Sequence, residues 1–177
     1  FLIIGAGIIG LSIGIEILRK KPGSKVLIVD KESHLGAHAS GRNSGVLHAG
    51  FYYSPDSLKA KFCRQGNIAL RHLIEKYSIE LRETGKVVVA KNNQEVERLD
   101  ALFERGIANK VKVELLPKSE LVNYEPLAIT HEKFLWSPTT AVSNPISVIQ
   151  AVAQEFEQLG GEIALETKVT FSKKHEV

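Results

Sequence analysis

The chain has 177 residues but no methionine and only one cysteine, Cys63. A single cysteine cannot form an internal disulfide, so we expect a reducing compartment and a cytoplasmic protein. The apolar runs stay short of the roughly 20 residues that span a bilayer, so no transmembrane segment is expected. Attachment to the periphery of the inner membrane is the alternative location.

Net charge is also small. Lys and Arg number 23 against 20 Asp and Glu, a net +3, which gives no indication of a nucleic acid partner. The composition, 44% hydrophobic and 24% charged, is that of a globular protein. The apolar start lacks a basic lead and is not expected to be a signal peptide. We expect no bound metal, and the lack of methionine favours a piece of a larger protein.

The first ten residues, FLIIGAGIIG, carry the main motif. Four apolar residues lead into Gly5, Gly7 and Gly10, and an apolar helical pattern follows to Lys21. This order predicts the strand, tight turn and helix N-terminus that hold a dinucleotide pyrophosphate. The first glycine permits the turn, the second lets phosphates approach the backbone, and the third lets helix pack on strand.

A second buried strand is expected at residues 25–30 and ends in Asp30. This residue lies 20 positions after Gly10 (30 − 10). An acidic residue there binds the ribose hydroxyls of the adenosine half, although a solvated strand-end carboxylate is the alternative. Lys31 and Glu32 either line the adenine side or face water. The pattern predicts an α/β, Rossmann-like domain with a parallel sheet.

Residues 35–53 are rich in Gly, Ser, Ala, Asn and His, with little periodicity before VLHAG. Such a composition suits a loop whose backbone approaches a ligand closely. The segment carries His38, Arg42, Asn43 and His48, which favours function, while a purely structural loop is the alternative.

Ser54, Pro55 and Asp56 predict the start of a long helix, with Ser54 as its N-cap. Cys63 is expected to pack inside rather than to react. The inner face is expected at Leu58, Phe62, Ala69, Leu73 and Tyr77, and the solvent face at Lys59, Lys61, Arg64 and Arg71.

From residue 84 the pattern changes. Strands are expected at 86–90 and 111–116, an amphipathic helix at 93–107, and an extended segment at 134–142. These elements predict a separate antiparallel sheet decorated by helices.

Asn144 and Pro145 then begin a helix that ends at Gly160 and Gly161. Residues 162–170 predict a strand that returns to the nucleotide-binding domain.

The glycine motif, Asp30 and the segment GRNSGVLHAGFYYSPDSLKAKFC together resemble the D-amino-acid-oxidase superfamily of FAD enzymes. Within it the chain is most similar to the L-2-hydroxyglutarate dehydrogenase/oxidase branch. The resemblance implies an N-terminal fragment of a longer flavoprotein. It implies an FAD-binding domain at 1–83 and 145–177 and part of an α+β substrate domain at 84–144.

The resemblance also implies roles for particular residues. The ADP half of FAD would be held by Gly5, Gly7, Gly10, Asp30 and Lys31. The ribityl chain and flavin ring would lie along Ala39, Ser40, Asn43, Ser44, Gly45, Val46 and Leu47. Val169, in the returning strand, would contact adenine through its backbone. Arg42, where the branch usually has His, and Tyr53 are the substrate-binding candidates, since a guanidinium can hold a carboxylate.

The implied chemistry is oxidation of a small 2-hydroxy acid to the 2-oxo acid by hydride transfer to flavin N5. His48 is the candidate base, and ordering of the flavin loop is its alternative role. Electrons would pass to oxygen or a quinone. We expect the chain alone to be inactive. An oxidase of amino acids or secondary amines, and a dinucleotide-binding module without chemistry, are the alternative functions.

Overall fold

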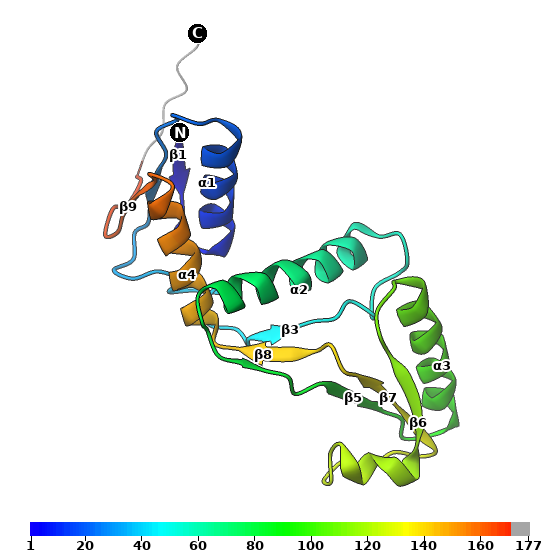
Figure 1. Ribbon diagram of the computed structural model, residues 1–177. Helices are drawn as coiled ribbons and strands as arrows, with labels where there is room; N and C mark the ends of the chain where they lie inside the picture. The colour runs from blue at the N-terminus through cyan, green and yellow to red at the C-terminus, as the bar shows by residue number, and fades with distance from the viewer. Residues whose placement is uncertain (171–177) are drawn as a thin grey trace. The chain divides into compact units, whose positions relative to one another are not determined.

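The computed structural model describes residues 1–170. Residues 171–177, the end of the predicted FAD-binding segment 145–177, lie outside the described part. By their internal contacts, residues 1–45 and those from Asn144 onward form one compact unit, and residues 46–143 form a second. Figure 1 follows the chain through both. Each unit is described separately below.

The first unit contains a parallel sheet of three strands, in the order β1 (Leu2–Ile4), β2 (Leu27–Val29) and β9 (Glu162–Ala164). Ile3 lies opposite Ile28, and Ile28 lies opposite Ile163. The predicted parallel sheet and the returning strand are therefore confirmed, but β9 ends at Ala164. Val169 lies beyond the strand, so its predicted place within it is wrong.

Two helices, α1 (Ile8–Lys20) and α4 (Pro145–Gln158), pack together beside this sheet (Figure 1). Gly14 of α1 faces the ring of Phe156 of α4, which is fully buried. The predicted start of α4 is confirmed, because the Asn144 Oδ1 atom accepts the N–H groups of Ile146 (2.9 Å) and Ser147 (3.3 Å).

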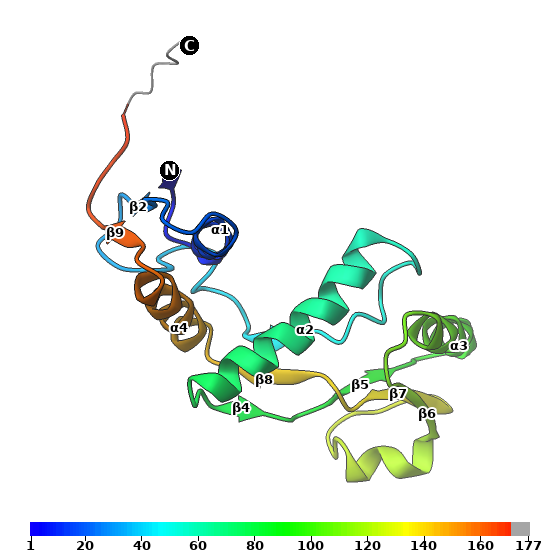
Figure 2. The same ribbon diagram turned by 45° about the horizontal axis from the view of Figure 1, so that its top comes forward.

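The second unit contains two antiparallel sheets of three strands each (Figure 2). One has the order β3 (Val46–Leu47), β8 (Ala141–Ser143) and β4 (Leu81–Arg82). The other has the order β5 (Lys86–Val89), β7 (Lys133–Ser137) and β6 (Glu114–Pro117). The predicted antiparallel sheet is confirmed, although the extended segment expected at 134–142 is two strands.

Helix α3 (Asn93–Ala108) packs on the second sheet, and the 3-10 helix η1 (Lys118–Asn123) follows β6. Phe51 and Leu135 are the most deeply buried large side chains of this core. Its other buried members are Ala49, Ala90, Val96, Leu99, Val111 and Val113.

Helix α2 (Leu58–Lys76) differs from its prediction at both its start and its inner face. Ser57, not Ser54, is the N-cap, and its Oγ atom accepts the N–H of Ala60 at 3.2 Å. The buried positions are Ala60, Asn67 and Ile74, which recur every seven residues, whereas Leu58 and Phe62 are 66% and 60% exposed. The prediction failed because it assumed that only apolar side chains of the helix are buried, whereas the buried face of α2 includes the polar side chain of Asn67.

The compact units divide the chain at positions that differ from the predicted domain limits. The β3 strand pairs with β8, so residues from Val46 onward join the second unit. The predicted FAD-binding domain, 1–83 and 145–177, and the predicted substrate domain, 84–144, are defined by what they bind. Those assignments remain a prediction. Among the described helices, none is long and apolar enough to cross a membrane.

Candidate functional site

The glycine turn after β1 has the geometry of a close backbone approach. Gly5 has a φ of +110°, in the region that favours glycine, and its N–H donates to the Val29 carbonyl at 2.8 Å. A Cβ on Gly10 would overlap the Gly5 carbonyl oxygen. A Cβ on Gly7 would lie 2.9 Å from the Ser40 Oγ atom. Larger side chains would therefore disturb this turn.

Asp30, at the end of β2, ties that strand to the glycine turn. Its Oδ2 atom accepts the N–H of Ala6 at 2.7 Å, and its Oδ1 atom accepts the N–H of Glu32 at 3.0 Å. Burial alone would raise the pKa of this carboxyl. The two N–H donors, together with the charges of His38 and Lys31, outweigh burial and lower the pKa. Asp30 is therefore a carboxylate at neutral pH.

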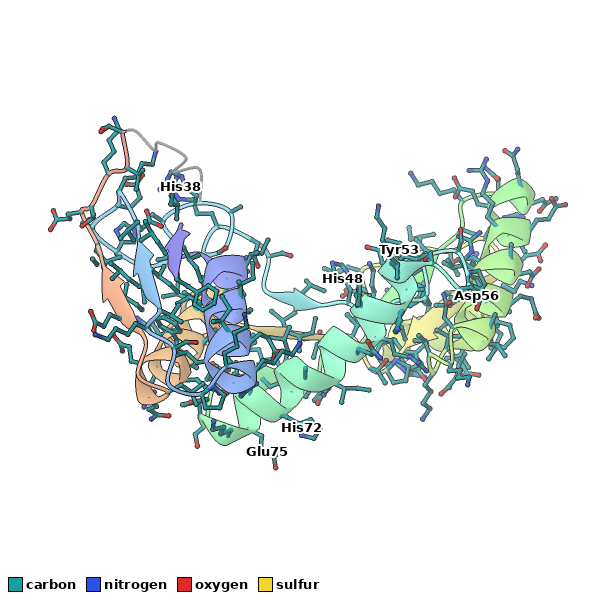
Figure 3. All side chains as sticks on the ribbon, turned by 90° about the horizontal axis from the view of Figure 1, so that it is seen from above. His38, His48, Tyr53, Asp56, His72 and Glu75 are labelled. Atoms are coloured by element: carbon teal, nitrogen blue, oxygen red, sulfur yellow. The ribbon has the colours of Figure 1, made fainter. Side chains whose placement is uncertain are left out.

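Lys31 and His38 both contact Glu32. The Glu32 Oε1 atom lies 2.8 Å from His38 Nε2 and 3.5 Å from Lys31 Nζ. The hydrogen bond from His38 is the main reason that the pKa of Glu32 is lowered. Figure 3 shows His38 on the loop that follows β2. These side chains surround the end of the strand that carries Asp30.

The side chain of Asn43 stabilises the loop at residues 39–45 by hydrogen bonds to the backbone of the same loop. The Asn43 Nδ2 atom donates to the carbonyls of Ala39 (3.1 Å) and Ser40 (2.8 Å), and its Oδ1 atom accepts the Gly45 N–H (2.9 Å). The Ser40 Oγ atom in turn accepts the N–H of Ile8 at 3.1 Å. The loop thus delivers a hydroxyl group to the N-terminus of α1.

That helix end is suited to an anion. The described first turn of α1 carries no acidic side chain, and Gly7, its N-cap, offers no side-chain cap. Unpaired N–H groups and the helix dipole favour negative charge at such a position. The turn, the Ser40 hydroxyl and the open space beside Gly5, where a Cβ would meet no atom within 4 Å, fit a pyrophosphate.

The other flavin-loop candidates, Val46, Leu47 and His48, belong to the second unit. Val46 and Leu47 form β3, and His48 follows it with an exposed side chain (Figure 3). The part of the imidazole that is shielded from water lowers the pKa of His48, and the positive charge of Lys86 lowers it further. His48 is therefore neutral at pH 7 and able to accept a proton.

The remaining candidates are dispersed. Arg42 and Ser44 are exposed on the first unit, and Val169 is 38% exposed. Tyr53 belongs to the second unit (Figure 3). The centroid of its ring lies 6.0 Å from Lys59 Nζ. Residues 1–170 contain no group of three or more His, Cys, Asp or Glu side chains that could hold a metal.

The sequence did not single out two polar residues of α2. Asn67 is buried and donates to three backbone carbonyls, including that of His48. Arg71, expected to face solvent, instead donates to Asn67 and pairs with Glu83. The sequence feature that could have indicated Asn67 is an asparagine in the middle of a helix. Asparagine has a low helix propensity, so its side chain is expected to form compensating hydrogen bonds there.

A parallel strand, a glycine turn, a helix and a carboxylate ending the next strand define a dinucleotide-binding unit of Rossmann type. The chain belongs to the FAD dependent oxidoreductase family, DAO, whose model matches residues 1–176. FAD is thus the cofactor on which this family depends.

Three similar proteins illustrate the relationship. The chain is 40% identical to mitochondrial L-2-hydroxyglutarate dehydrogenase from Caenorhabditis elegans over 162 residues, covering 91% of this chain and 37% of that protein. It is 38% identical to L-2-hydroxyglutarate dehydrogenase from Escherichia coli K12, covering 99% and 41%. The FAD-bound L-alpha-glycerophosphate oxidase from Mycoplasma pneumoniae superposes with a TM-score of 0.81 at 28% identity, covering 96% and 45%. The chain therefore spans about two fifths of the length of the curated relatives it matches.

Proposed function

We propose that this chain is the FAD-binding part, with part of the substrate domain, of an oxidoreductase that converts a small 2-hydroxy acid, such as L-2-hydroxyglutarate, to its 2-oxo acid. The observation that carries the proposal is 38–40% identity to L-2-hydroxyglutarate dehydrogenases over more than nine tenths of the chain. The geometry of the glycine turn and Asp30 supports the cofactor assignment.

The first unit would hold the cofactor. The N-terminus of α1 and the Ser40 hydroxyl would bind the pyrophosphate, and Asp30 would accept hydrogen bonds from the ribose. Each Asp30 oxygen has one backbone donor and keeps lone-pair capacity for another. Lys31 would lie on the adenosine side. When bound, FAD would supply the two-electron chemistry by accepting hydride at flavin N5.

The second unit would contribute the proton acceptor. An alcohol loses its O–H proton as its C–H bond is oxidised, so a neutral base near that oxygen is required. His48 is neutral at pH 7 because of its packing and the charge of Lys86. Arg42 and Tyr53 are the candidates for contacts with the substrate, and the cationic side chain of Arg42 suits its carboxylate.

Anaerobic mixing of the FAD-loaded, full-length protein with a panel of substrates tests the reaction class. We expect loss of the oxidised flavin absorbance with L-2-hydroxyglutarate and none with its D-enantiomer, glycine or L-proline. Bleaching by the amines alone would replace the proposal with an amine oxidase. A full-length protein that is colourless when purified without added FAD, and that releases no flavin on denaturation, would leave only a dinucleotide-binding module.

Replacing His48 tests the base. His48→Gln keeps a polar side chain but cannot accept the proton, so flavin reduction is expected to slow by on the order of a hundredfold or more. A parent rate in this variant would leave His48 with the ordering role only. Reoxidation of the reduced protein by oxygen and by a soluble quinone, compared at equal concentrations, tests the proposed electron acceptors.

Location is also a proposal. We infer a cytoplasmic protein from the single cysteine, although the C. elegans relative is named a mitochondrial protein. Fractionation of cells that express the full-length protein distinguishes the two compartments.

A further inference from the structure

A buried asparagine holds the backbone that carries His48. The Asn67 Nδ2 atom lies 3.3 Å from the Leu47 carbonyl oxygen, 3.2 Å from that of His48 and 3.4 Å from that of Thr139. Its two N–H protons are therefore shared among three acceptors. Asn67 is only 9% exposed, so these bonds offset the cost of burying its amide.

The orientation of this amide is fixed by Arg71. The Arg71 Nε atom donates to Asn67 Oδ1 at 2.9 Å, and Nη2 donates to the Thr139 carbonyl at 2.9 Å. A guanidinium group only donates, so Oδ1 must face Arg71 and Nδ2 must face the carbonyls. Arg71 is itself held by an ion pair with Glu83, whose Oε2 atom lies 3.0 Å from Nη2.

The sheet alone leaves His48 weakly placed. The β3 strand has only two residues, with Val46 opposite Val142 and Leu47 opposite Ala141. His48 is the first residue beyond that pairing. Its carbonyl is bound from α2 by Asn67 and, at 3.4 Å, by the Cys63 thiol.

We propose that Asn67, Arg71 and Glu83 are positioning residues for His48. The network anchors the His48 carbonyl to α2 and so sets the direction in which the imidazole leaves the chain. The inference rests on the proposed role of His48 as base. The effect of the network on the imidazole is nevertheless measurable by itself.

The charged groups around His48 make its pKa a measure of where the imidazole lies. Lys86 on β5 is the charge that lowers its pKa. On α2, Arg71 is paired with Glu83, and the pKa of Cys63 is raised by burial, so its thiol is neutral. An imidazole that moves away from Lys86 and its packing should regain its ordinary pKa.

The test uses Asn67→Leu in the FAD-loaded, full-length protein, since leucine keeps the volume and removes every hydrogen bond. NMR titration of ¹³C-labelled histidine, with the His48 signal assigned from His48→Gln, is expected to show its pKa rising toward the ordinary 6.5. Flavin reduction by L-2-hydroxyglutarate is expected to slow roughly tenfold with little change in the substrate Kd, because a misplaced catalytic group mainly slows the chemical step.

Asn109 provides a matched control. It is 8% exposed and donates to the carbonyls of Gly50 (3.3 Å) and Tyr53 (2.8 Å) in the same segment. Asn109→Leu should destabilise the protein similarly and leave the pKa of His48 unchanged. Arg71→Lys, which keeps the charge but lacks the Nε–H donor, is expected to raise the pKa of His48 by less than Asn67→Leu.

Arg71→Lys also keeps the test decisive if Asn67→Leu does not fold. An unmoved His48 pKa in the folded Asn67 and Arg71 variants, or an equal shift in Asn109→Leu, would overturn the proposal. A shifted pKa combined with a parent rate in His48→Gln would leave the network standing and remove the proposed base.

Discussion

A methyl group at Gly14 should destabilise the first unit, against the usual effect of this substitution in a helix. Gly→Ala in a helix interior normally stabilises by about 1 kcal/mol. At Gly14, however, the new Cβ would lie 2.6 Å from Phe156 Cε2 and 3.3 Å from Ile28 Cδ1. Both neighbours are fully buried and have little room to move. Overpacking of this kind costs about 1–3 kcal/mol, so the net effect is a loss of up to about 2 kcal/mol.

Gly66, in α2, is the matched control because a Cβ there meets no atom within 4 Å. Gly66→Ala should stabilise α2 by up to about 1 kcal/mol. The two glycines belong to different compact units, so the assay is native-state hydrogen exchange of the α1, α4 and α2 amides rather than a single melting midpoint. Phe156→Leu in the Gly14→Ala background should recover part of the loss, since leucine vacates the space of the ring. Stabilisation of α1 by Gly14→Ala alone, to the extent seen for Gly66→Ala, would refute the packing argument.

Three other outcomes are expected. Gly10→Ala should leave the purified protein largely without FAD absorbance, because the Gly5 carbonyl that its Cβ would overlap is backbone and cannot rotate away. The pKa of Asp30 is lowered from its ordinary 3.8 in the folded chain. Its contribution to stability is therefore fully present above pH 3.8 and is lost as the pH falls through the pKa of the folded state. Asp30→Asn should remove this pH dependence from a plot of the free energy of unfolding against pH. Lys86→Gln should raise the pKa of His48, so the rise of flavin reduction rate with pH should shift to higher pH, and a pH profile identical to the parent's would contradict the influence of Lys86.

The local patterns that predicted elements correctly were the ones whose causes are also local. Gly5 adopts its positive φ in the turn, and Asn144 caps α4, because both depend only on nearby backbone geometry. The apolar runs at β1 and β2 predicted the parallel strands correctly. The expected burial holds for β2 but not for β1, where Leu2 and Ile4 are 61% and 65% exposed.

Helix α2 shows where local reasoning failed. Its apolar periodicity pointed to Leu58 and Phe62 as interior residues, whereas Asn67 is buried and both apolar side chains are exposed. The sequence around Asn67 does not indicate that the carbonyls of Leu47, His48 and Thr139 lie next to it and need a hydrogen-bond donor. Only a fold that brings residues 47–48 and 139 to α2 makes an asparagine favourable there.

The sequence by itself determined the glycine turn, the acidic end of β2 and the resemblance that predicts a flavin-binding loop, because these depend on residue type and spacing. The tertiary structure decided which groups meet across long separations. It brought Ser40 to the N-terminus of α1, Phe156 to Gly14, and Asn67 to the carbonyl of His48. Such contacts depend on packing between elements that lie far apart in the chain, and the composition of each element leaves them open.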